Sequence, residues 1–324
     1  MKAWYLKLES GVASLEAREV PVPEPRAGEM RVRVKAASLN RGEFIYAHGA
    51  AANADARPSG QEAAGEVDAV GEGVAGWKRG DRVMGRVRGG GFAEYALIDA
   101  REAMPVPPSL SWDAAAAVPI VMMVTYDMLW EQGELRLGEW LLVTGVTSGV
   151  GVASLQMAKL LGARVIGTSG SKAKLERLAA EGLDVALATR AADFSAGVLA
   201  ATGGKGANLA VNNVGGTMFA ECVKSLAYRG RLATVGYLDR TFRAEIDIDA
   251  LHAKRLRLFG VSNRFRTPAE RAATVQGFID HIVPALADGR IRPLVDRTFG
   301  FDELPAAKAY MDSDAQVGKI VVSE

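Results

Sequence analysis

The spacing of apolar and polar residues changes near the middle of the chain. Up to about residue 99, apolar residues come in short runs, such as residues 30–36, that are separated by proline and glycine. The glycine-containing segments 71–80 and 89–91 stand where turns between such runs are expected. Short runs between turn residues are typical of antiparallel strands, so we predict a barrel-like β domain for this part of the chain.

After Trp140 the pattern becomes a repeat of an apolar strand, a glycine-rich turn and a segment with helical periodicity. We predict strands over residues 140–144, 163–168, 185–188, 208–212, 232–235 and 256–261, helices over residues 150–161, 172–180 and 218–226, and a closing strand over residues 318–322. This alternation predicts an α/β fold with a parallel, doubly wound sheet. Such sheets bind ligands beyond the carboxyl ends of their strands, so we expect a cofactor there.

Length and charge narrow the class of protein. A chain of 324 residues is long enough for two domains, and we predict one over residues 1–121, completed by residues 265–324, and another over residues 122–264. The 39 basic and 38 acidic side chains give a formal charge of +1, which offers no basic excess to nucleic acid or to a membrane surface. We therefore expect a small-molecule substrate.

Cysteine content and the apolar stretches bear on the compartment. Cys222 is the only cysteine, which excludes an intramolecular disulfide and a structural zinc site built on several thiolates. Residues 1–10 lack the order of basic and apolar regions that marks a signal peptide. The longest nearly apolar stretch, residues 114–126, contains Pro119 and is shorter than the roughly 20 residues of a membrane-spanning helix. We expect a cytoplasmic protein.

A glycine-rich turn joins the predicted strand 140–144 to the next helix, and it reads GVTSGVG over residues 145–151. Glycine permits left-handed backbone angles and close approach to a pyrophosphate, while a helix N-terminus offers unpaired N–H groups. The turn predicts a dinucleotide-binding loop. Its predicted contacts are Gly145, Thr147, Ser148, Gly149, Val150 and Gly151. The alternative is an ordinary strand-to-helix turn in a protein that binds no nucleotide.

The segment after the second predicted strand of this domain bears on the choice of cofactor. Sites specific for NAD place an acidic residue about 20 residues after the loop, against the ribose 2′-hydroxyl. Here residues 167–174 read GTSGSKAK, and the first acid is Glu176. Ser169, Ser171, Lys172 and Lys174 can donate hydrogen bonds to a 2′-phosphate, so we predict NADPH as the cofactor. Alternatively, both lysines lie on a solvated helix face.

Several short motifs, taken in order, resemble those of the medium-chain dehydrogenase/reductase superfamily, and within it the zinc-free quinone oxidoreductase branch. They are GQEAAG at 60–65, GDRV at 80–83, GFAEY at 91–95, VT at 124–125, the loop at 145–151, VG at 214–215 and GKIV at 318–321. The resemblance spans nearly the whole chain. It implies a GroES-like β-barrel catalytic domain, a Rossmann domain, and a homodimer formed through the edge of the Rossmann sheet.

The resemblance also bears on zinc. The superfamily's zinc-dependent alcohol dehydrogenases carry a cysteine ligand in the first domain and a histidine in a G-H-E motif. Gln61 stands in place of that histidine, no cysteine precedes Cys222, and His48, the only histidine of the first domain, lies at neither ligand position. We therefore expect no catalytic zinc. Without a Lewis acid, conjugated acceptors become better substrates than simple alcohols, because they can spread the charge left by hydride addition.

Individual site residues follow from the same resemblance. Asn40 matches the family's active-site asparagine, Thr125 a residue near the nicotinamide amide, and Lys174 the lysine that binds the 2′-phosphate. Tyr46 falls where related reductases present a tyrosine to the substrate, and its phenol can donate a proton or a hydrogen bond; a packing role is the alternative. His48 is a weaker donor candidate, and a solvated loop histidine is its alternative.

Two positions depart from the family's pattern. Arg190 follows Thr189 where many relatives hold a tyrosine over the adenosine phosphate, so we expect it to clamp that phosphate. Asn212 replaces an acid at the end of the fourth strand. The remaining predicted cofactor contacts are Asn263 and Lys319. Arg264 and Arg266 can attract a carboxylate or the phosphates of a thioester carrier, or can be solvated or paired with backbone carbonyls.

Three functions remain open from the sequence. The first is an NADPH-dependent oxidoreductase that transfers hydride to a quinone or an α,β-unsaturated carbonyl without zinc. The second is a reductase of enoyl thioesters or unsaturated acids. The third is an NADPH-binding protein with a regulatory or structural role and no efficient turnover, since a fold alone does not establish catalysis.

Overall fold

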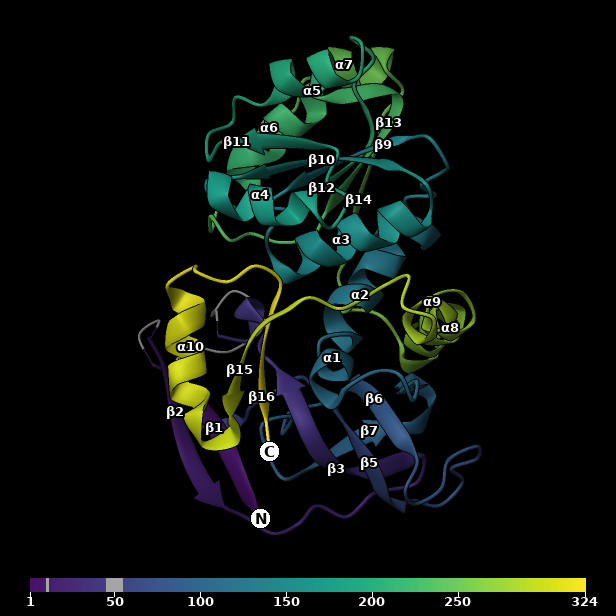
Figure 1. Ribbon diagram of the computed structural model, residues 1–324, viewed down its shortest axis with the longest axis vertical. Coiled ribbons are helices and arrows are strands. Elements are labelled where there is room, and N and C mark those ends of the chain that lie inside the picture. Colours follow the sequence, from purple (N-terminus) through teal and green to yellow (C-terminus); the bar gives the residue numbers. More distant parts are fainter. Residues whose placement is uncertain (10–11, 45–54) are drawn as a thin grey trace. The chain divides into compact units, whose positions relative to one another are not determined.

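The computed structural model describes residues 1–9, 12–44 and 55–324 and divides them into two compact units (Figure 1). Unit 1 comprises residues 1–123 and 267–324, and unit 2 comprises residues 124–266. The sequence predicts a second domain over residues 122–264, and the second unit of the structure covers residues 124–266. The chain thus leaves the first unit to build the second and then returns to complete the first.

The strands of unit 1 pair antiparallel, except for the parallel pair β15 and β16. One sheet has the order β2-β1-β4, and a larger one has the order β15-β16-β3-β5-β6-β8, with β7 also paired to β3. The strands are β1 (Lys2–Glu9), β2 (Val12–Glu19), β3 (Glu29–Ser38), β4 (Arg57–Pro58), β5 (Glu62–Val70), β6 (Arg82–Arg86), β7 (Tyr95–Asp99), β8 (Ala103–Pro105), β15 (Val295–Gly300) and β16 (Lys319–Ser323). Apolar side chains that alternate along β3, such as Met30, Val32 and Val34, form the core between the sheets.

Helices and short turns complete unit 1. They are α1 (Trp112–Ala116), the start of α2 (Pro119–Tyr126), α8 (Pro268–His281), α9 (Val283–Ala287), α10 (Leu304–Asp312) and the single turns η1 (Arg41–Phe44), η3 (Ala100–Glu102) and η5 (Phe301–Glu303). The apolar stretch 114–126 forms two short helices rather than one, because Pro119 cannot continue the hydrogen-bonding pattern of α1 and instead begins α2. Within the described residues, no helix is long and apolar enough to span a membrane.

Unit 2 is a six-stranded parallel sheet of order β11-β10-β9-β12-β13-β14. Its strands are β9 (Trp140–Thr144), β10 (Arg164–Ser169), β11 (Val185–Ala188), β12 (Ala207–Asn212), β13 (Leu226–Thr234) and β14 (Arg257–Gly260). The order reverses between β9 and β12, as in the doubly wound dinucleotide-binding fold. The fold class predicted from the sequence is confirmed.

Helices cover both faces of this sheet. In Figure 1, α3 (Gly149–Leu160) and α4 (Lys172–Ala179) lie on one face, and α5 (Ser195–Ala201), α6 (Gly216–Lys224) and α7 (Ile248–Ala253) lie on the other. A π-helical turn, η4 (Asp127–Glu131), precedes β9. Because helices shield both faces, the central strands are almost wholly apolar, with Leu141, Leu142 and Val143 fully buried.

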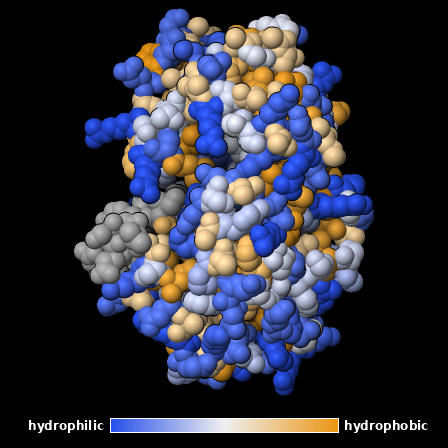
Figure 2. All heavy atoms as spheres, turned by 60° about the vertical axis from the view of Figure 1, so that its left-hand side comes forward, coloured by the Kyte–Doolittle hydropathy of each residue, from blue (hydrophilic) through white to orange (hydrophobic). Residues whose placement is uncertain are grey.

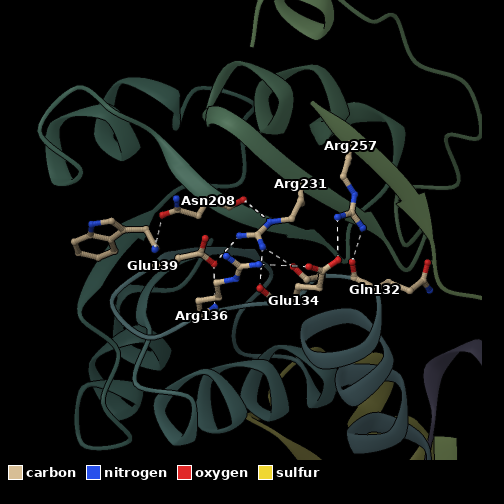
Figure 3. Close-up of polar contacts among 9 residues, drawn as sticks. Gln132, Glu134, Arg136, Glu139, Asn208, Arg231 and Arg257 are labelled. Carbon is tan, nitrogen blue, oxygen red and sulfur yellow. Dashed lines mark hydrogen bonds and ion pairs between the residues drawn. The ribbon is translucent and has the colours of Figure 1, made fainter. Parts of the chain in front are cut away.

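A polar network fixes the amino-terminal side of the sheet in unit 2 (Figure 3). The Arg231 guanidinium donates to the carbonyls of Gly133, Glu134 and Asn208, at 2.7, 2.9 and 3.2 Å, and pairs with Glu139 at 2.6 Å. Arg257, at the start of β14, pairs with Glu134 at 3.1 Å. The network ties the segment before β9 to β12, β13 and β14, at the edge opposite the expected ligand site.

Large apolar side chains are scattered over the surface. Hydrophilic residues predominate on the face shown in Figure 2. Among the described residues, the exposed large apolar ones are Val22, Val70, Leu137, Tyr228, Leu238, Phe242, Ile248 and Phe265. Single exposed apolar residues are normal on a folded protein.

Candidate functional site

The glycine-rich turn lies between β9 and α3, as the sequence predicts. Gly145 has a φ of +62°, a left-handed conformation that glycine adopts without strain. Ser148 caps α3, since its hydroxyl accepts a 3.1 Å hydrogen bond from the Gly151 N–H. The turn thus presents the N-terminus of a twelve-residue helix at the carboxyl end of β9, which is the arrangement that binds a pyrophosphate.

Gly151 is required for a reason that differs from the one expected. Its φ is not positive, and a Cβ atom there would lie 2.5 Å from the Val146 carbonyl oxygen and 2.6 Å from that of Gly145. The glycine therefore allows α3 to pack closely against the backbone of its own turn. Thr147, Gly149 and Val150 complete the predicted set, with Gly149 as the first residue of α3.

The residues predicted to bind a 2′-phosphate come together after β10. The Ser169 hydroxyl lies 3.5 Å from that of Thr147 and accepts a 3.3 Å bond from the Ser171 N–H, which links this turn to the glycine-rich turn. Ser171 caps α4 by accepting from the Lys174 N–H at 3.4 Å. The Arg190 side chain lies against Gly170, where an added Cβ would collide with it.

Lys172 has a different position. Its ammonium pairs with Glu176 at 3.9 Å, and the two side chains are 83% and 66% exposed. This lysine thus fits the alternative of a solvated helix face, whereas Lys174 and Arg190 stand at the turn itself.

Asn212, a predicted cofactor contact, is bonded to the turn that follows β12. Its amide is fully buried, with Oδ1 accepting from the N–H groups of Val214 and Gly215 at 3.1 Å and Nδ2 donating to the Gly215 carbonyl at 2.8 Å. Because both ends of the amide bond the backbone of the next turn, Asn212 shapes that turn, and its contact with a cofactor stays a prediction. The neighbouring Asn213 does the same by bonding Thr144 through its backbone N–H and its side chain.

Asp239 supports the turn that Asn212 shapes, and sequence reasoning missed it. Its carboxylate accepts bonds from the Thr217 N–H and hydroxyl, at 2.8 and 2.6 Å, and from the Thr241 N–H at 2.9 Å. Although burial opposes ionisation, these bonds lower the pKa of Asp239. Only the pairing of segments far apart in the chain shows this role.

Two predicted residues at the edge of unit 2 differ in their surroundings. Thr125, near the end of α2, is fully buried, and its hydroxyl has no hydrogen-bond partner among the described residues. A buried hydroxyl of this kind is suited to a ligand, because an unmet hydrogen bond is costly. Asn263, beyond β14, is exposed and accepts a long 3.5 Å bond from Arg266, while the Arg264 guanidinium lies over the exposed Phe265 ring.

In unit 1, Asn40 belongs to a buried polar cluster centred on Glu62. One Glu62 oxygen accepts from the Ser38 hydroxyl at 2.5 Å, the Asn40 amide at 2.6 Å and the Lys319 ammonium at 3.0 Å. The other accepts from the Ile120 N–H at 2.6 Å. Because the amide of Asn40 lies between an anion and a cation, its orientation is fixed.

Lys319, which the sequence predicts as a cofactor contact, is a member of this cluster, and its contact with a cofactor stays a prediction. Its ammonium is buried and donates to the Leu39 carbonyl at 2.8 Å, to the Asn40 Oδ1 at 2.8 Å and to Glu62. An ammonium has three donors, and all three are used within unit 1. The sequence offered Glu62 only as part of the GQEAAG motif, and nothing in it pointed to Lys319 as the partner.

Glu43, on η1, is a second buried carboxyl beside this cluster. One of its oxygens accepts a bond from the Gly60 N–H, and the other has no partner among the described residues. Burial raises the pKa of Glu43 to about 7. Tyr46 and His48, which follow η1, lie outside the described residues, so Tyr46 stays a prediction from the sequence.

The described side chains bear on the expected absence of zinc. In the part of the chain that the structure describes, no group of three or more His, Cys, Asp or Glu side chains is placed to hold a metal ion. Cys222 lies in the core of unit 2, where burial raises the pKa of its thiol and so disfavours the thiolate that binds zinc. The cation that contacts Asn40 and Glu62 is the ammonium of Lys319.

Comparison with known families agrees with this architecture. A family model described as alcohol dehydrogenase GroES-like domain matches residues 26–108, and one described as zinc-binding dehydrogenase matches residues 149–278. The first lies within unit 1, and the second covers most of unit 2.

Curated relatives include reductases of several kinds. The chain is 28% identical to the quinone oxidoreductase of Rattus norvegicus and 27% identical to the acryloyl-coenzyme A reductase of Metallosphaera sedula; the first match covers 94% of this chain and 92% of the relative, the second 95% and 96%. It is 31% identical to a phenolphthiocerol/phthiocerol polyketide synthase subunit of Mycobacterium tuberculosis. That match covers 96% of this chain but only 14% of the synthase subunit.

A solved structure shares the fold over the full length. A mycobacterial protein complexed with NADPH is 26% identical to this chain and superposes with a TM-score of 0.86, with 100% of both chains covered. Together with the matches to both domains, this shows that the chain belongs to the medium-chain dehydrogenase/reductase superfamily, in the branch that includes quinone oxidoreductases and enoyl reductases.

Proposed function

We propose that this oxidoreductase transfers hydride from NADPH to a quinone or an α,β-unsaturated carbonyl without zinc. The observation that carries the proposal is the buried cluster of Asn40, Glu62 and Lys319, whose cation is an ammonium and which adjoins Gln61, the residue that stands in place of the zinc-ligand histidine. Without a Lewis acid, the acceptor itself must spread the charge left by hydride addition, and conjugated carbonyls do so.

The residues of unit 2 fit a dinucleotide. The turn from Gly145 to Gly151, with the N-terminus of α3, would hold the pyrophosphate, and Ser169, Lys174 and Arg190 would hold the 2′-phosphate. The Thr125 hydroxyl, which has no partner in the described part of the chain, would orient the nicotinamide. When bound, the reduced nicotinamide would supply the hydride.

The polar residues of unit 1 would handle the acceptor. Asn40, fixed by Glu62 and Lys319, would hold the reacting oxygen with its remaining amide hydrogen. Tyr46, as predicted from the sequence, would donate a proton or hydrogen bond to the developing enolate or phenolate. Both roles need the side chains held in one orientation, which the buried ion pair provides for Asn40.

The closest alternative acceptor is an enoyl thioester or an unsaturated acid. The name of the acryloyl-coenzyme A reductase relative favours it. Arg264 and Arg266, beyond β14, could attract the carboxylate or phosphates of such substrates. Activity toward an unsaturated acid that is lost in Arg264→Ala, with activity toward a neutral enone retained, would favour this alternative.

The acceptor class is tested by following NADPH oxidation with quinones, enones, enoyl thioesters and saturated aldehydes. We expect turnover with conjugated acceptors and none with saturated aldehydes. NADPH oxidation with saturated aldehydes alone, or with no acceptor of the panel, would contradict the proposal.

Lys174→Ala is expected to weaken NADPH binding selectively. Losing a charge-assisted bond to the 2′-phosphate should cost about 1.5 to 3 kcal/mol of binding free energy, while NADH affinity should change little. Titration of both cofactors measures this. Lys172→Ala is the matched control, because that side chain is exposed and paired with Glu176, and it should leave both affinities unchanged. Equal weakening of both cofactors in Lys174→Ala would remove the residue from the phosphate site.

The assembly proposed from the sequence is a homodimer. β14 is an edge strand of the sheet in unit 2, and an edge strand is a place where a second copy can add to the sheet. Light scattering on the purified protein tests this, and a monomeric mass at all concentrations would contradict it. We also propose a cytoplasmic location, on the grounds of composition given above.

A further inference from the structure

Glu43 is an unusual residue because its carboxyl is buried without full hydrogen bonding. The side chain is 3% exposed, and its backbone N–H donates to the Asn40 carbonyl at 3.0 Å, so it lies one turn of η1 beyond Asn40. One carboxyl oxygen accepts from the Gly60 N–H, while the other has no partner among the described residues. A buried polar atom without a partner in a native structure calls for an explanation.

The charged groups that face Glu43 come from three strands. They are Arg57 of β4, Glu62 of β5 and Lys319 of β16. The ammonium of Lys319 is already bonded to Glu62 and Asn40, and no positively charged side chain among the described residues is bonded to Glu43 itself. A carboxyl in such surroundings is favoured in its uncharged form.

The pKa of Glu43 lies within the physiological pH range. Burial raises the pKa of Glu43 to about 7, and the charge of Glu62 adds to this, while the Gly60 N–H, Arg57 and Lys319 oppose it. Glu43 is therefore mostly uncharged below pH about 7 and mostly ionised above it.

Ionisation of Glu43 would change the hydrogen bonding in the neighbouring cluster of Asn40, Glu62 and Lys319. Two buried carboxylates, Glu43 and Glu62, would then compete for the ammonium of Lys319, which also holds the Asn40 side chain at 2.8 Å. Movement of the ammonium toward Glu43 would weaken its bond to Asn40, because its three donors are already in use. Ionised Glu43 would thus act on the Asn40 side chain by displacing the ammonium of Lys319.

We propose that Glu43 is a positioning residue: while uncharged it leaves Lys319 to hold Asn40 in place, and when ionised it releases Asn40, so that reduction of the acceptor depends on proton concentration. This inference rests on the proposed function, in which Asn40 holds the reacting oxygen. It requires no proton transfer from Glu43 to the substrate.

Glu43→Gln tests the proposal through the pH profile of turnover. Glutamine keeps the shape and can accept from the Gly60 N–H, but it stays uncharged. In the wild type, kcat/KM for a conjugated acceptor should fall as pH rises through about 7, by about tenfold per pH unit once the ionised form dominates. The variant should keep the low-pH activity within about twofold and lose this fall.

Glu66→Gln is the matched control. Glu66 is a half-buried glutamate on β5, and the variant should retain the wild-type profile.

Two kinetic results would overturn the proposal. One is a Glu43→Gln variant that retains the fall in kcat/KM near pH 7, because the titrating group would then lie elsewhere. The other is a variant that is inactive even at low pH, because the proton of Glu43, rather than its lack of charge, would then be needed.

A structural measurement separates this proposal from the proposed function. Crystal structures of the wild type about two pH units below and about two above the pKa of Glu43 should show the contact between Lys319 Nζ and Asn40 Oδ1 kept at low pH and broken at high pH. In Glu43→Gln the contact should persist at both. A contact unchanged in the wild type would overturn the proposal, whether or not any acceptor is reduced, while absence of turnover with the structural change present would count against the proposed function alone.

Discussion

Gly151→Ala is expected to lower NADPH affinity by about ten- to hundredfold, which corresponds to about 1.4 to 2.8 kcal/mol. The added Cβ would lie 2.5 and 2.6 Å from two backbone carbonyl oxygens of the turn before α3. Backbone cannot rotate away as a flexible side chain can, so α3 and the turn must separate. Overpacking of this kind costs about 1 to 3 kcal/mol. Calorimetric titration with NADPH measures the loss.

Gly260→Ala is the matched control for this substitution. Gly260 also belongs to unit 2 and ends β14, but a Cβ there would have no atom within 4 Å, and its φ is not positive. The control should bind NADPH as the wild type does. If Gly151→Ala, folded by circular dichroism, also bound with unchanged affinity, the turn would not be the pyrophosphate site.

Lys319→Ala is expected to lower the free energy of unfolding by about 3 to 5 kcal/mol. The substitution leaves the fully buried Glu62 carboxylate without a cation, and it removes the bonds to Asn40 and to the Leu39 carbonyl. Denaturant unfolding measures this change. Lys35→Ala is the control, because its pair with the half-exposed Glu324 lies at the surface and should contribute about 0 to 1 kcal/mol.

A second variant separates the lost charge from the lost packing. Lys319→Met removes the charge but keeps most of the side-chain volume, so it should retain most of the destabilisation of Lys319→Ala if the unpaired Glu62 carboxylate is the cause. A Lys319→Ala protein as stable as the Lys35→Ala control would contradict the ion pair at the centre of unit 1.

The sheet of unit 2 could be predicted because its signals are local. β9 and β11 match their predicted ranges, since each is an apolar run that ends at a turn. β13 is an exception and begins at Leu226 rather than at residue 232. Its first half contains Arg229, with a φ of +59°, and Gly230, which resemble turn residues in the sequence. Pairing with β12 at Leu226 extends the strand, and this tertiary contact has no local signal.

The residues of the glycine-rich turn and those of the buried cluster in unit 1 also differ in how local their sequence signals are. Ser169, Lys174 and the glycine-rich turn follow one another within about 30 residues, so their spacing is visible in the sequence. Lys319 is separated from Asn40 by 279 positions and from Glu62 by 257, and a lysine in an apolar final strand carries no mark of its partner. The buried carboxyl of Glu43 was missed for a related reason, because burial depends on strands that are distant in the chain.

The most direct test of the central claim is the fate of a deuterium label. NADPH carrying deuterium at the transferred position of C4 is incubated with an enone and with protein treated with a metal chelator, and the product is analysed by mass spectrometry and NMR. The proposed function predicts one deuterium on the carbon β to the carbonyl, with the chelator having no effect. Deuterium on the carbonyl carbon instead, or transfer that stops on chelation and returns with zinc, would contradict it.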